Sequence, residues 1–441
     1  MPFSGEKRRK MKFRVVSGIV LVLLLTTTFT LAFNVQTANA ADWWPMFHHD
    51  PNHTGYSSSS APNTNSTIWV YTTGDEVWSS PAVADGKVYV GSFDSKVYCL
   101  DASTGAEIWN YATGDWVLSS PAVADGKVYF GAFDSKVYCV DASTGEHIWN
   151  YTTGEQVSSS PAVADGKVYV GSHDNKTYCL NASSGEHIWN YTTGNIVSSS
   201  PAVADGKVYV GSHDDKVYCL DASTGAHIWN YTTGSNVYAS PAVADGKVYV
   251  GSQDYKIYCL NASTGAHIWN YTTGNIVHSS PAVADGKVYV GSRDDKVYCL
   301  DALTGAHIWN STITDIIGNE VSSSPAVADG KVYFGAWDSK VYCVDASTGA
   351  HIWNYTTGSA LTPVSSSPAV ADGKVYVGSW SHKVYCFGDL PPLPPPPPQV
   401  IVGGTSVSIN TPAWTQYVGA IAAIVSIVAV SSIAIKRKKK Q

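Results

Sequence analysis

The stretch SSPAVADGKVYVGS at residues 79–92 decides the fold, because near copies of it recur along the chain. Copies begin at Ser119, Ser159, Ser199 and Ser279, and variant copies surround Pro241, Pro325 and Pro368. Equivalent prolines are 40 residues apart from Pro81 to Pro281, and the last two intervals are 44 and 43 residues. A repeat of this length is typical of one four-stranded blade of a β-propeller.

Each repeat contains four segments that favour β-strands: SSPAVA, KVYVGS, KVYCLDA and a final segment of the form HIWNYTTG. Asp85-Gly86 predicts a tight hairpin turn between the first two segments, and Asp94-Ser95 predicts the next turn. The second and third segments are apolar on both sides instead of alternating. Both faces of each sheet must therefore be covered, as they are when blades stack around an axis.

The number of final segments shows how the ring closes. The tryptophan of this segment occurs eight times, at Trp69, Trp109, Trp149, Trp189, Trp229, Trp269, Trp309 and Trp353. The first of them precedes every other strand, and the last repeat, which ends at Cys386-Phe387, has none. We therefore expect an all-β, eight-bladed propeller with four-stranded antiparallel blades, in which the strand around Ile68 to Thr73 completes the last blade and removes the open seam.

Both ends of the chain carry features of membrane targeting. Val15 to Phe33 is apolar, follows a cationic stretch and precedes Ala38-Asn39-Ala40, a pattern typical of a cleaved secretory signal; an uncleaved anchor is the alternative. Residues 414–435 carry no formal charge and, as a helix, would span about 33 Å. The KRKKK stretch after them favours a cytoplasmic C-terminus, so we expect a single-pass cell-membrane protein with its propeller outside.

These observations divide the chain into six predicted segments. They are a signal peptide (1–40), a lead-in segment (41–62), the propeller (63–389), a proline-rich stalk (390–412), a transmembrane helix (413–435) and a basic cytoplasmic tail (436–441). Of the 28 Lys and Arg residues, 11 lie at the two ends, whereas 34 of the 35 acidic residues lie between them. This excess of acid argues against a nucleic-acid partner, since binding to phosphates needs clustered cations.

The cysteines and the glycosylation motifs both follow the repeat. Each cysteine occupies the same place in the third segment, and neighbouring sheets are too far apart for disulfides, so we expect eight buried thiols: Cys99, Cys139, Cys179, Cys219, Cys259, Cys299, Cys343 and Cys386. N-x-S/T motifs begin at Asn52, Asn65, Asn150, Asn175, Asn181, Asn190, Asn230, Asn261, Asn270, Asn310 and Asn354. If the host modifies these motifs, the protein is a glycoprotein. The alternative is that a single motif was copied along with its repeat.

The segment DASTGAEIW at residues 101–109, with its copies, resembles the tryptophan-docking motif of the pyrroloquinoline quinone (PQQ) repeat propellers. WWPMFHHDPNHTGYS at residues 43–57 is similar to the segment that precedes such propellers. The resemblance covers about residues 42–389 and implies that each of the eight tryptophans packs between neighbouring blades. It implies less about function, because the family includes quinoprotein dehydrogenases, outer-membrane assembly lipoproteins and other surface proteins.

The resemblance to dehydrogenases implies one asymmetric site with calcium ligands, a carboxylate base and commonly a pair of adjacent cysteines. No Cys-Cys pair occurs, and Asp85, Asp94 and Asp101 recur blade after blade as turn residues, which does not favour catalysis at one point. The first cysteine is Cys99, so the lipidated cysteine of the assembly lipoproteins has no counterpart after the signal. We therefore expect a protein that is not an enzyme and that needs no cofactor or metal.

Differences among the copies predict where a ligand binds. Since strands alternate in direction, the turns between second and third strands share one face with the loops that join blades, and this face gains aromatic residues. The predicted ligand face contains Phe93, Trp337, Trp380, Trp78, Trp116, Tyr238 and Arg293. Aromatic side chains dominate recognition sites, so we expect a monomeric binding or scaffolding module for an extracellular glycan or protein. A PQQ-dependent oxidoreductase and a structural envelope glycoprotein are the alternatives.

Overall fold

The computed structural model of the chain describes residues 42–312, 320–359, 361–390, 399–402 and 405–408. The predicted signal peptide, transmembrane helix and basic tail lie outside these residues, as does the proline run 391–398. None of the described segments forms an apolar helix of membrane-spanning length. Among the described residues, those from Asp42 to Asp389 belong to one compact unit and those from Leu390 onward belong to a second.

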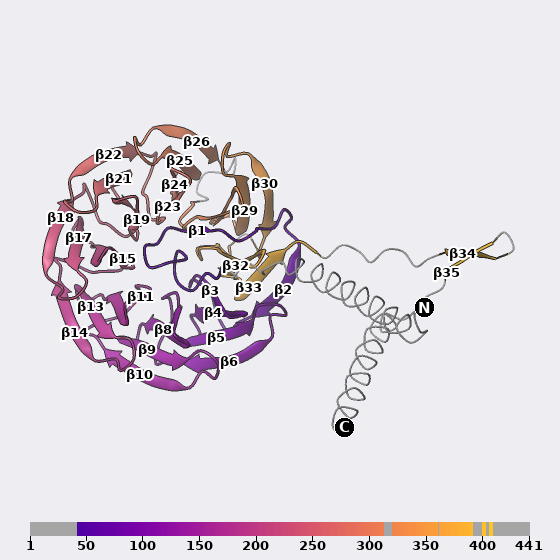
Figure 1. The fold of residues 1–441 in the computed structure, drawn as a ribbon, viewed down its shortest axis with the longest axis horizontal. Helices are drawn as coiled ribbons and strands as arrows, with labels where there is room; N and C mark the ends of the chain where they lie inside the picture. Colours follow the sequence, from indigo (N-terminus) through magenta and orange to yellow (C-terminus); the bar gives the residue numbers. More distant parts are fainter. Residues whose placement is uncertain (1–41, 313–319, 360, 391–398, 403–404, 409–441) are drawn as a thin grey trace, which may run out of the picture. The chain divides into compact units, whose positions relative to one another are not determined.

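The first unit is a ring of eight four-stranded antiparallel blades (Figure 1), which confirms the predicted propeller. Blades 1 to 4 consist, from the axis outward, of β3 (Ala82–Ala84), β4 (Lys87–Ser92), β5 (Lys96–Asp101) and β6 (Glu107–Ala112); β7 (Ala122–Ala124), β8 (Lys127–Ala132), β9 (Lys136–Asp141) and β10 (His147–Thr152); β11 (Ala162–Ala164), β12 (Lys167–Gly171), β13 (Lys176–Asn181) and β14 (His187–Thr192); and β15 (Ala202–Ala204), β16 (Lys207–Gly211), β17 (Lys216–Asp221) and β18 (His227–Thr232).

The other blades repeat this order, except that the outer strand of blade 8 comes from the N-terminal part of the chain. Blades 5 to 8 consist of β19 (Ala242–Ala244), β20 (Lys247–Gly251), β21 (Lys256–Asn261) and β22 (His267–Thr272); β23 (Ala282–Ala284), β24 (Lys287–Ser292), β25 (Lys296–Asp301) and β26 (His307–Thr312); β27 (Ala326–Ala328), β28 (Lys331–Gly335), β29 (Lys340–Asp345) and β30 (His351–Thr356); and β31 (Ala369–Ala371), β32 (Lys374–Ser379), β33 (Lys383–Gly388) and β2 (Thr67–Thr72). In the second unit, β34 (Gln399–Val402) pairs antiparallel with β35 (Thr405–Ser408). This strand pair lies within the segment predicted as a stalk, for which the sequence analysis expected no strands.

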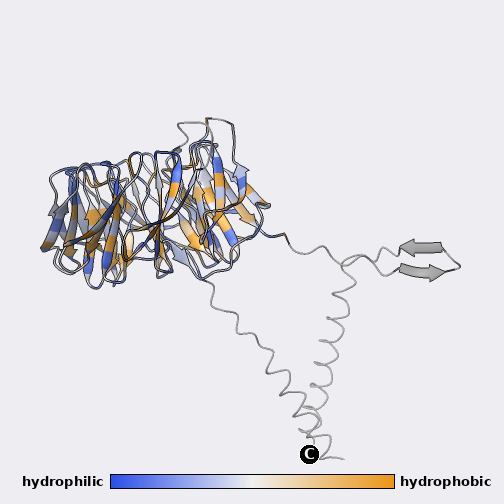
Figure 2. Ribbon diagram, turned by 90° about the horizontal axis from the view of Figure 1, so that it is seen from above, coloured by the Kyte–Doolittle hydropathy of each residue, from blue (hydrophilic) through white to orange (hydrophobic). Residues whose placement is uncertain are grey.

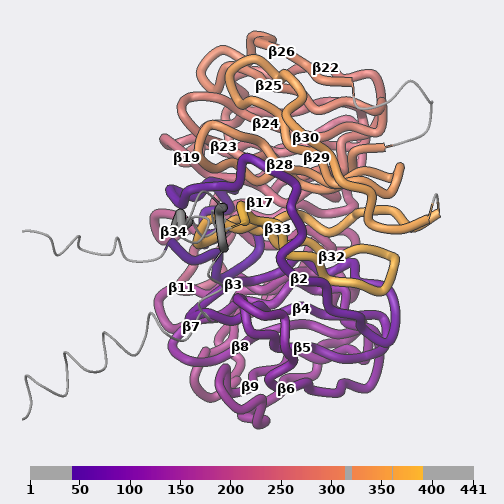
Figure 3. Tube along the Cα trace, turned by 90° about the vertical axis from the view of Figure 1, so that its right-hand side faces the viewer, coloured from indigo at the N-terminus to yellow at the C-terminus, as the bar shows by residue number. Residues whose placement is uncertain are grey.

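Blade 8 closes the ring as the strand count predicts. β2 pairs antiparallel with β33 (Figure 3). In the register of this pair, Trp69 lies opposite Cys386. The carboxylate of Asp389 accepts the backbone N–H groups of Asn63 and Thr64, each at 3.1 Å. The first and last parts of the propeller are therefore joined both by a strand pair and by a hydrogen-bonded carboxylate.

Each blade is fastened to the next through one tryptophan and one tyrosine. The carbonyl of Ala142 in blade 2 accepts the indole N–H of Trp109 at 3.2 Å and the hydroxyl of Tyr89 at 3.0 Å, both from blade 1. All eight of these tryptophans are buried, so they dock between blades as expected. Trp353 is the exception in its hydrogen bonding, because its indole N–H has no partner among the described residues.

The interior of the blades is apolar and their turns are polar (Figure 2). All eight cysteines are buried and unpaired, as the sequence predicts, and burial raises the pKa of the Cys219 thiol to about 12. The hairpin turn at Asp85-Gly86 has φ angles of 50° and 71°. Two left-handed residues in succession define the type I′ turn that matches the twist of paired strands, and this explains the repeated Asp-Gly.

The lead-in segment is part of the propeller and fills one end of its axis (Figure 1). Its carbonyl oxygens accept the backbone N–H of the central valine in the innermost strand of six blades: Val83, Val123, Val203, Val243, Val283 and Val327. β1 (Tyr56–Ser57) adds a parallel pair with β27. The innermost strands would otherwise leave these N–H groups unpaired around the axis, so the lead-in segment satisfies them.

Two histidines of the lead-in segment are fully buried and neutral. His48 Nδ1 lies 3.4 Å from the carbonyl of His53, and His53 Nδ1 lies 3.3 Å from the carbonyl of Pro241. A carbonyl only accepts, so each Nδ1 carries the proton, and neither Nε2 has a partner in the described structure. Burial lowers the pKa of His48 to about 3 and that of His53 to about 4, from an ordinary value of 6.5.

The propeller is therefore expected to lose stability as the pH falls below 6.5. In this range the unfolded chain binds protons that the folded chain does not, which costs up to about 2 kcal/mol per histidine by about pH 5. Chemical denaturation at each pH measures this loss. The variant His48→Asn/His53→Asn, whose asparagines tolerate the positive φ of both sites, should show a flatter pH dependence. An equally steep dependence in the variant would contradict the assignment.

Candidate binding site on the propeller axis

The two faces of the ring differ as the strand directions predict. On one face the turn after the innermost strand meets the turn before the outermost strand, since Ala102 N donates to the Gly86 carbonyl at 2.9 Å. On the other face the turn between the second and third strands meets the loop that leaves the blade, since Thr113 N donates to the Ser95 carbonyl at 2.8 Å. We call the latter the variable face.

Aromatic side chains follow one another along the variable face from blade 7 to blade 3. Trp78 and Trp380 are stacked, with ring centroids 4.3 Å apart and planes 5° from parallel. Trp337 lies 5.8 Å from Trp380, and Phe93 lies 4.8 Å from Trp78. The complete aromatic arc, in spatial order, is Trp337, Trp380, Trp78, Phe93, Trp116, Phe133 and His173.

The indole rings of this arc are held in place by hydrogen bonds. Trp337 Nε1 donates to Ser322 Oγ and Trp380 Nε1 to Ser365 Oγ, each at 2.7 Å. Trp78 Nε1 donates to the Glu76 carboxylate at 2.8 Å. Each of these rings therefore has its orientation set before any ligand arrives, which reduces the entropy that binding would remove.

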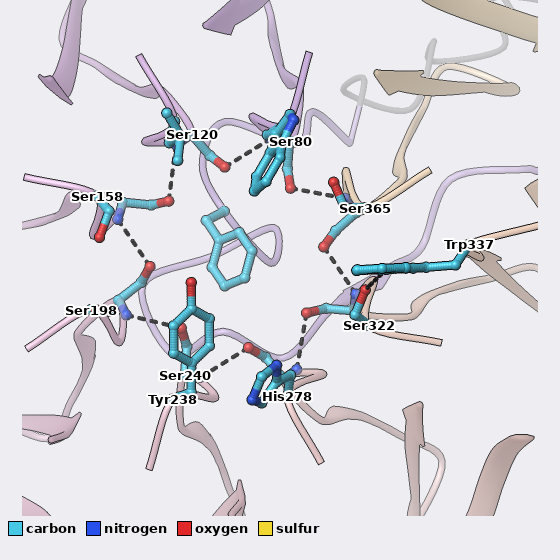
Figure 4. Close-up of a pocket in the computed structure, with 18 of the residues that line it drawn as sticks. Ser80, Ser120, Ser158, Ser198, Tyr238, Ser240, His278, Ser322, Trp337 and Ser365 are labelled. Carbon is cyan, nitrogen blue, oxygen red and sulfur yellow. Dashed lines mark hydrogen bonds between the residues drawn. The ribbon is translucent and has the colours of Figure 1, made fainter. Parts of the chain in front are cut away.

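A second aromatic group faces the axis from the loops that enter blades 5 and 6 (Figure 4). Tyr238 stacks on His278 with ring centroids 4.8 Å apart, and it lies 5.6 Å from His213. His278 is neutral at physiological pH, because burial and then the charge of Arg293 lower its pKa to about 4. Its Nε2 lies 2.8 Å from the side-chain nitrogen of Gln253, as expected of an uncharged acceptor.

The two groups surround a cavity of about 330 Å³ on the axis, which we call the axial well. Its wall has two layers, because residues two apart in an extended segment point to the same side. The outer layer consists of Trp78, Leu118, Ser158, Ser198, Tyr238, His278, Ser322 and Ser365. The inner layer consists of Ser80, Ser120, Ser160, Ser200, Ser240, Ser280, Ser324 and Ser367, which we call the serine ring. Phe47 of the lead-in segment also lines the well.

The serine ring is a closed circle of hydrogen bonds (Figure 4). The backbone N–H of each member donates to the hydroxyl oxygen of the member in the next blade, and the last, Ser367, donates to Ser80; all eight distances are 2.9 to 3.0 Å. No hydroxyl of the ring donates a hydrogen bond to another described residue. Eight O–H groups are therefore still available as donors at the axis.

The charged groups around the well neutralise one another. Arg293 is the one cationic side chain among the described residues of its lining, and its Nε lies 3.0 Å from the Glu320 carboxylate. The guanidinium also lies 5.8 Å from the centre of the Trp337 ring. No carboxylate belongs to that described lining. The well consequently presents hydroxyl groups and aromatic rings with little net charge.

The structure brings most of the predicted ligand face together. Five of its residues line the well: Trp78, Trp337, Trp380, Tyr238 and Arg293. Phe93 and Trp116 lie beside it in the aromatic arc. Sequence reasoning missed the serine ring and the part played by Phe47. The signal for the ring was present, since the serine before each proline occurs in all eight copies, even where its neighbour is Ala239.

The residues of the well do not fit a calcium-bound quinone. Calcium needs several oxygen ligands, carboxylates above all, and the described lining of the well contains no carboxylate. In the part of the chain that the structure describes, no three His, Cys, Asp or Glu side chains are grouped as metal ligands. Each cysteine is buried within its own blade, so no two of them face a shared ligand.

Comparison with known proteins places the fold. Residues 52–247 match the family model described as the beta-propeller of the beta-alanine-activating enzyme, and residues 214–392 match that of the outer membrane protein assembly factor BamB. No match was found among curated protein sequences.

Solved structures with the same fold include both enzymes and an assembly factor. BamB from Moraxella catarrhalis is 19% identical, with a TM-score of 0.64, and the match covers 74% of this chain and 99% of BamB. A europium-containing methanol dehydrogenase is 16% identical, with a TM-score of 0.67, over 79% of this chain and 98% of the enzyme. The quinohemoprotein alcohol dehydrogenase from Comamonas testosteroni is 18% identical, with a TM-score of 0.67, over 83% and 84%. At these identities the likeness concerns the fold alone.

Proposed function

The chain belongs to the PQQ-like repeat β-propellers, and from this fold and the geometry of its axial well we propose that it is a non-catalytic binding module. Its ligand is an extracellular glycan or protein that enters the well from the variable face. The observation that carries the proposal is the convergence of Trp337, Trp380 and Trp78 with Tyr238 around one cavity. Pre-ordered aromatic side chains around a small concave site are typical of recognition.

A binding role accounts for the distribution of variation better than catalysis does. The serine ring is the same in every blade, whereas the outer layer has serine in four blades and Trp78, Leu118, Tyr238 and His278 in the other four. Catalysis needs an acid, base or nucleophile aimed at one point, and the described lining provides only the paired Arg293 and the neutral His278 as titrating groups besides Tyr238. The lack of fit to calcium and quinone supports the same choice.

We also propose that the propeller is held at the outer surface of the cell membrane. The support comes from the sequence: the apolar segment 413–435, the basic residues after it and the secretory signal before residue 41. In the sequence, the proline-rich segment lies between the propeller and the proposed membrane span.

The variant Trp337→Ala/Trp380→Ala tests the proposed function. The full-length chain is immobilised and exposed to envelope glycans and to envelope proteins, and the bound ligand is then titrated against wild type and variant. Removing two anchoring aromatic residues should weaken binding at least about 30-fold. Leu303→Ala, which removes a 67% exposed side chain from the opposite face, should leave binding unchanged. Equal affinity of the tryptophan variant and wild type would show that the ligand binds elsewhere.

A further inference from the structure

We infer that the ligand of the axial well is the neutral terminal sugar of a glycan, inserted end-on along the propeller axis. The inference rests on the proposed function and narrows it to one chemical class. It follows from three properties of the well: the hydroxyl donors of its inner layer, the aromatic rings of its outer layer and its lack of unpaired charge.

The serine ring supplies donors suited to a hydroxyl-rich ligand. Each ring oxygen already accepts one backbone N–H, for example that of Ser160 at the hydroxyl of Ser200, at 3.0 Å. The serine side chains are buried, and their O–H groups donate to no other described residue, so a ligand that offers acceptor oxygens satisfies them. Sugar hydroxyls both accept and donate, and several of them surround each ring, which matches donors arranged in a circle.

The aromatic residues that line the well provide apolar surfaces against which a sugar ring can pack. Trp337 and Tyr238 extend toward the axis from different sides of the well (Figure 4). The indole of Trp337 is fixed by Ser322, and Tyr238 leaves 44% of its surface exposed. A pyranose presents C–H groups on its faces and hydroxyls at its edges, so it can contact aromatic rings and hydroxyl donors simultaneously.

The charges and the size of the well favour a neutral chain end. The charge of Arg293 is offset by the Glu320 carboxylate 3.0 Å from its Nε, so the well has little net charge with which to attract an acidic sugar. The cavity of about 330 Å³ is at the lower end of the range for ligand sites, about 300 to 1,000 Å³. It therefore admits a terminal unit, and the rest of the chain would extend outward past the variable face. A folded protein would instead have to project a side chain into the well.

The inference is tested with the full-length chain and immobilised oligosaccharides that end in a neutral hexose, in an N-acetylhexosamine or in a uronic acid, all of equal length. We expect binding to neutral termini. We expect Trp337→Leu/Trp380→Leu to weaken it at least about tenfold, and Trp337→Phe/Trp380→Phe to weaken it less, because phenylalanine keeps an aromatic face. Ser160→Ala/Ser200→Ala should also weaken it about tenfold, whereas Ser223→Ala on the opposite face should not.

Four outcomes overturn the inference. Binding restricted to uronic acid termini and lost in Arg293→Gln would assign the well to anions. If the ligand is instead an envelope protein that carries no glycan, and the tryptophan variants lose its binding, the inference is overturned and the proposed function remains intact. Glycan binding that the leucine variant retains would place the sugar outside the well. No tryptophan-dependent ligand of any class would overturn the proposed function as well. Thermal melts establish that each variant is folded, and the Phe variant keeps the test valid if Ser160→Ala/Ser200→Ala unfolds.

Discussion

A chain from which residues 65–74 are deleted is expected to unfold roughly 10 °C or more below the intact protein. The deletion removes all of β2 (Thr67–Thr72), leaves β33 without its outer partner and removes Trp69 from the interface with blade 1. Loss of a buried tryptophan alone costs about 3 to 5 kcal/mol. The open seam also exposes the face of blade 8 and the edge of β33, so the total effect should exceed that of any single substitution.

The measurement is a thermal melt followed by circular dichroism, with the intact chain melted in parallel. Val70→Thr is the matched control, because it changes an exposed side chain of β2 that is 43% accessible and leaves the strand pair in place. It should melt within about 1 °C of the intact protein, since surface substitutions of this kind change stability by about 0.5 kcal/mol or less. An unchanged midpoint after the deletion would mean that β2 does not hold the ring closed.

The second large effect is expected where a glycine meets a docking tryptophan. Gly225 has a φ of +71°, and a Cβ atom there would lie 2.6 Å from Cδ2 of Trp189. Gly206, in the same blade, has a φ of +70° and nothing within 4 Å of its Cβ position. The two glycines therefore have similar positive φ angles, but only Gly225 lies against a tryptophan side chain.

We expect Gly206→Ala to lower the free energy of unfolding by about 1 kcal/mol, the cost of a left-handed alanine. Gly225→Ala carries the same strain and also forces Trp189 out of its position between blades 3 and 4, so it should lower the free energy of unfolding by about 4 kcal/mol or more. Denaturant titration of both variants measures the difference. Equal losses would show that the tryptophan contact adds nothing to the stability of the ring.

Much of this architecture could be predicted from the sequence because the information is local and repeated. The apolar runs and the Asp-Gly pairs specify strands and type I′ turns within one blade, as Asp85 and Gly86 show. The surplus final segment at Trp69 predicts the closure, because a ring leaves no strand without a partner. The candidate site was predicted in part: strand direction alone places Trp337 and Trp380 on one face with Phe93.

What the sequence by itself determined, then, is the kind of blade, the number of blades and the face on which the aromatic residues lie. Tertiary structure alone decided how these residues meet. Trp78 and Trp380 are far apart in the chain and stack only because closure of the ring brings blade 8 beside blade 1. The serine ring likewise depends on the curvature of the ring, since Ser367 must reach Ser80 to complete it.

The lead-in segment shows most clearly which features could not be predicted from the sequence. It has no repeat and no hydrophobic period, so nothing in it predicts that Phe47 lines the well or that His48 and His53 are buried on the axis. Its conformation is set by the unpaired N–H groups of the innermost strands, which exist as a group only after the blades have assembled. Local sequence can specify which way a side chain points, but the distance between side chains one blade apart follows from the closed ring.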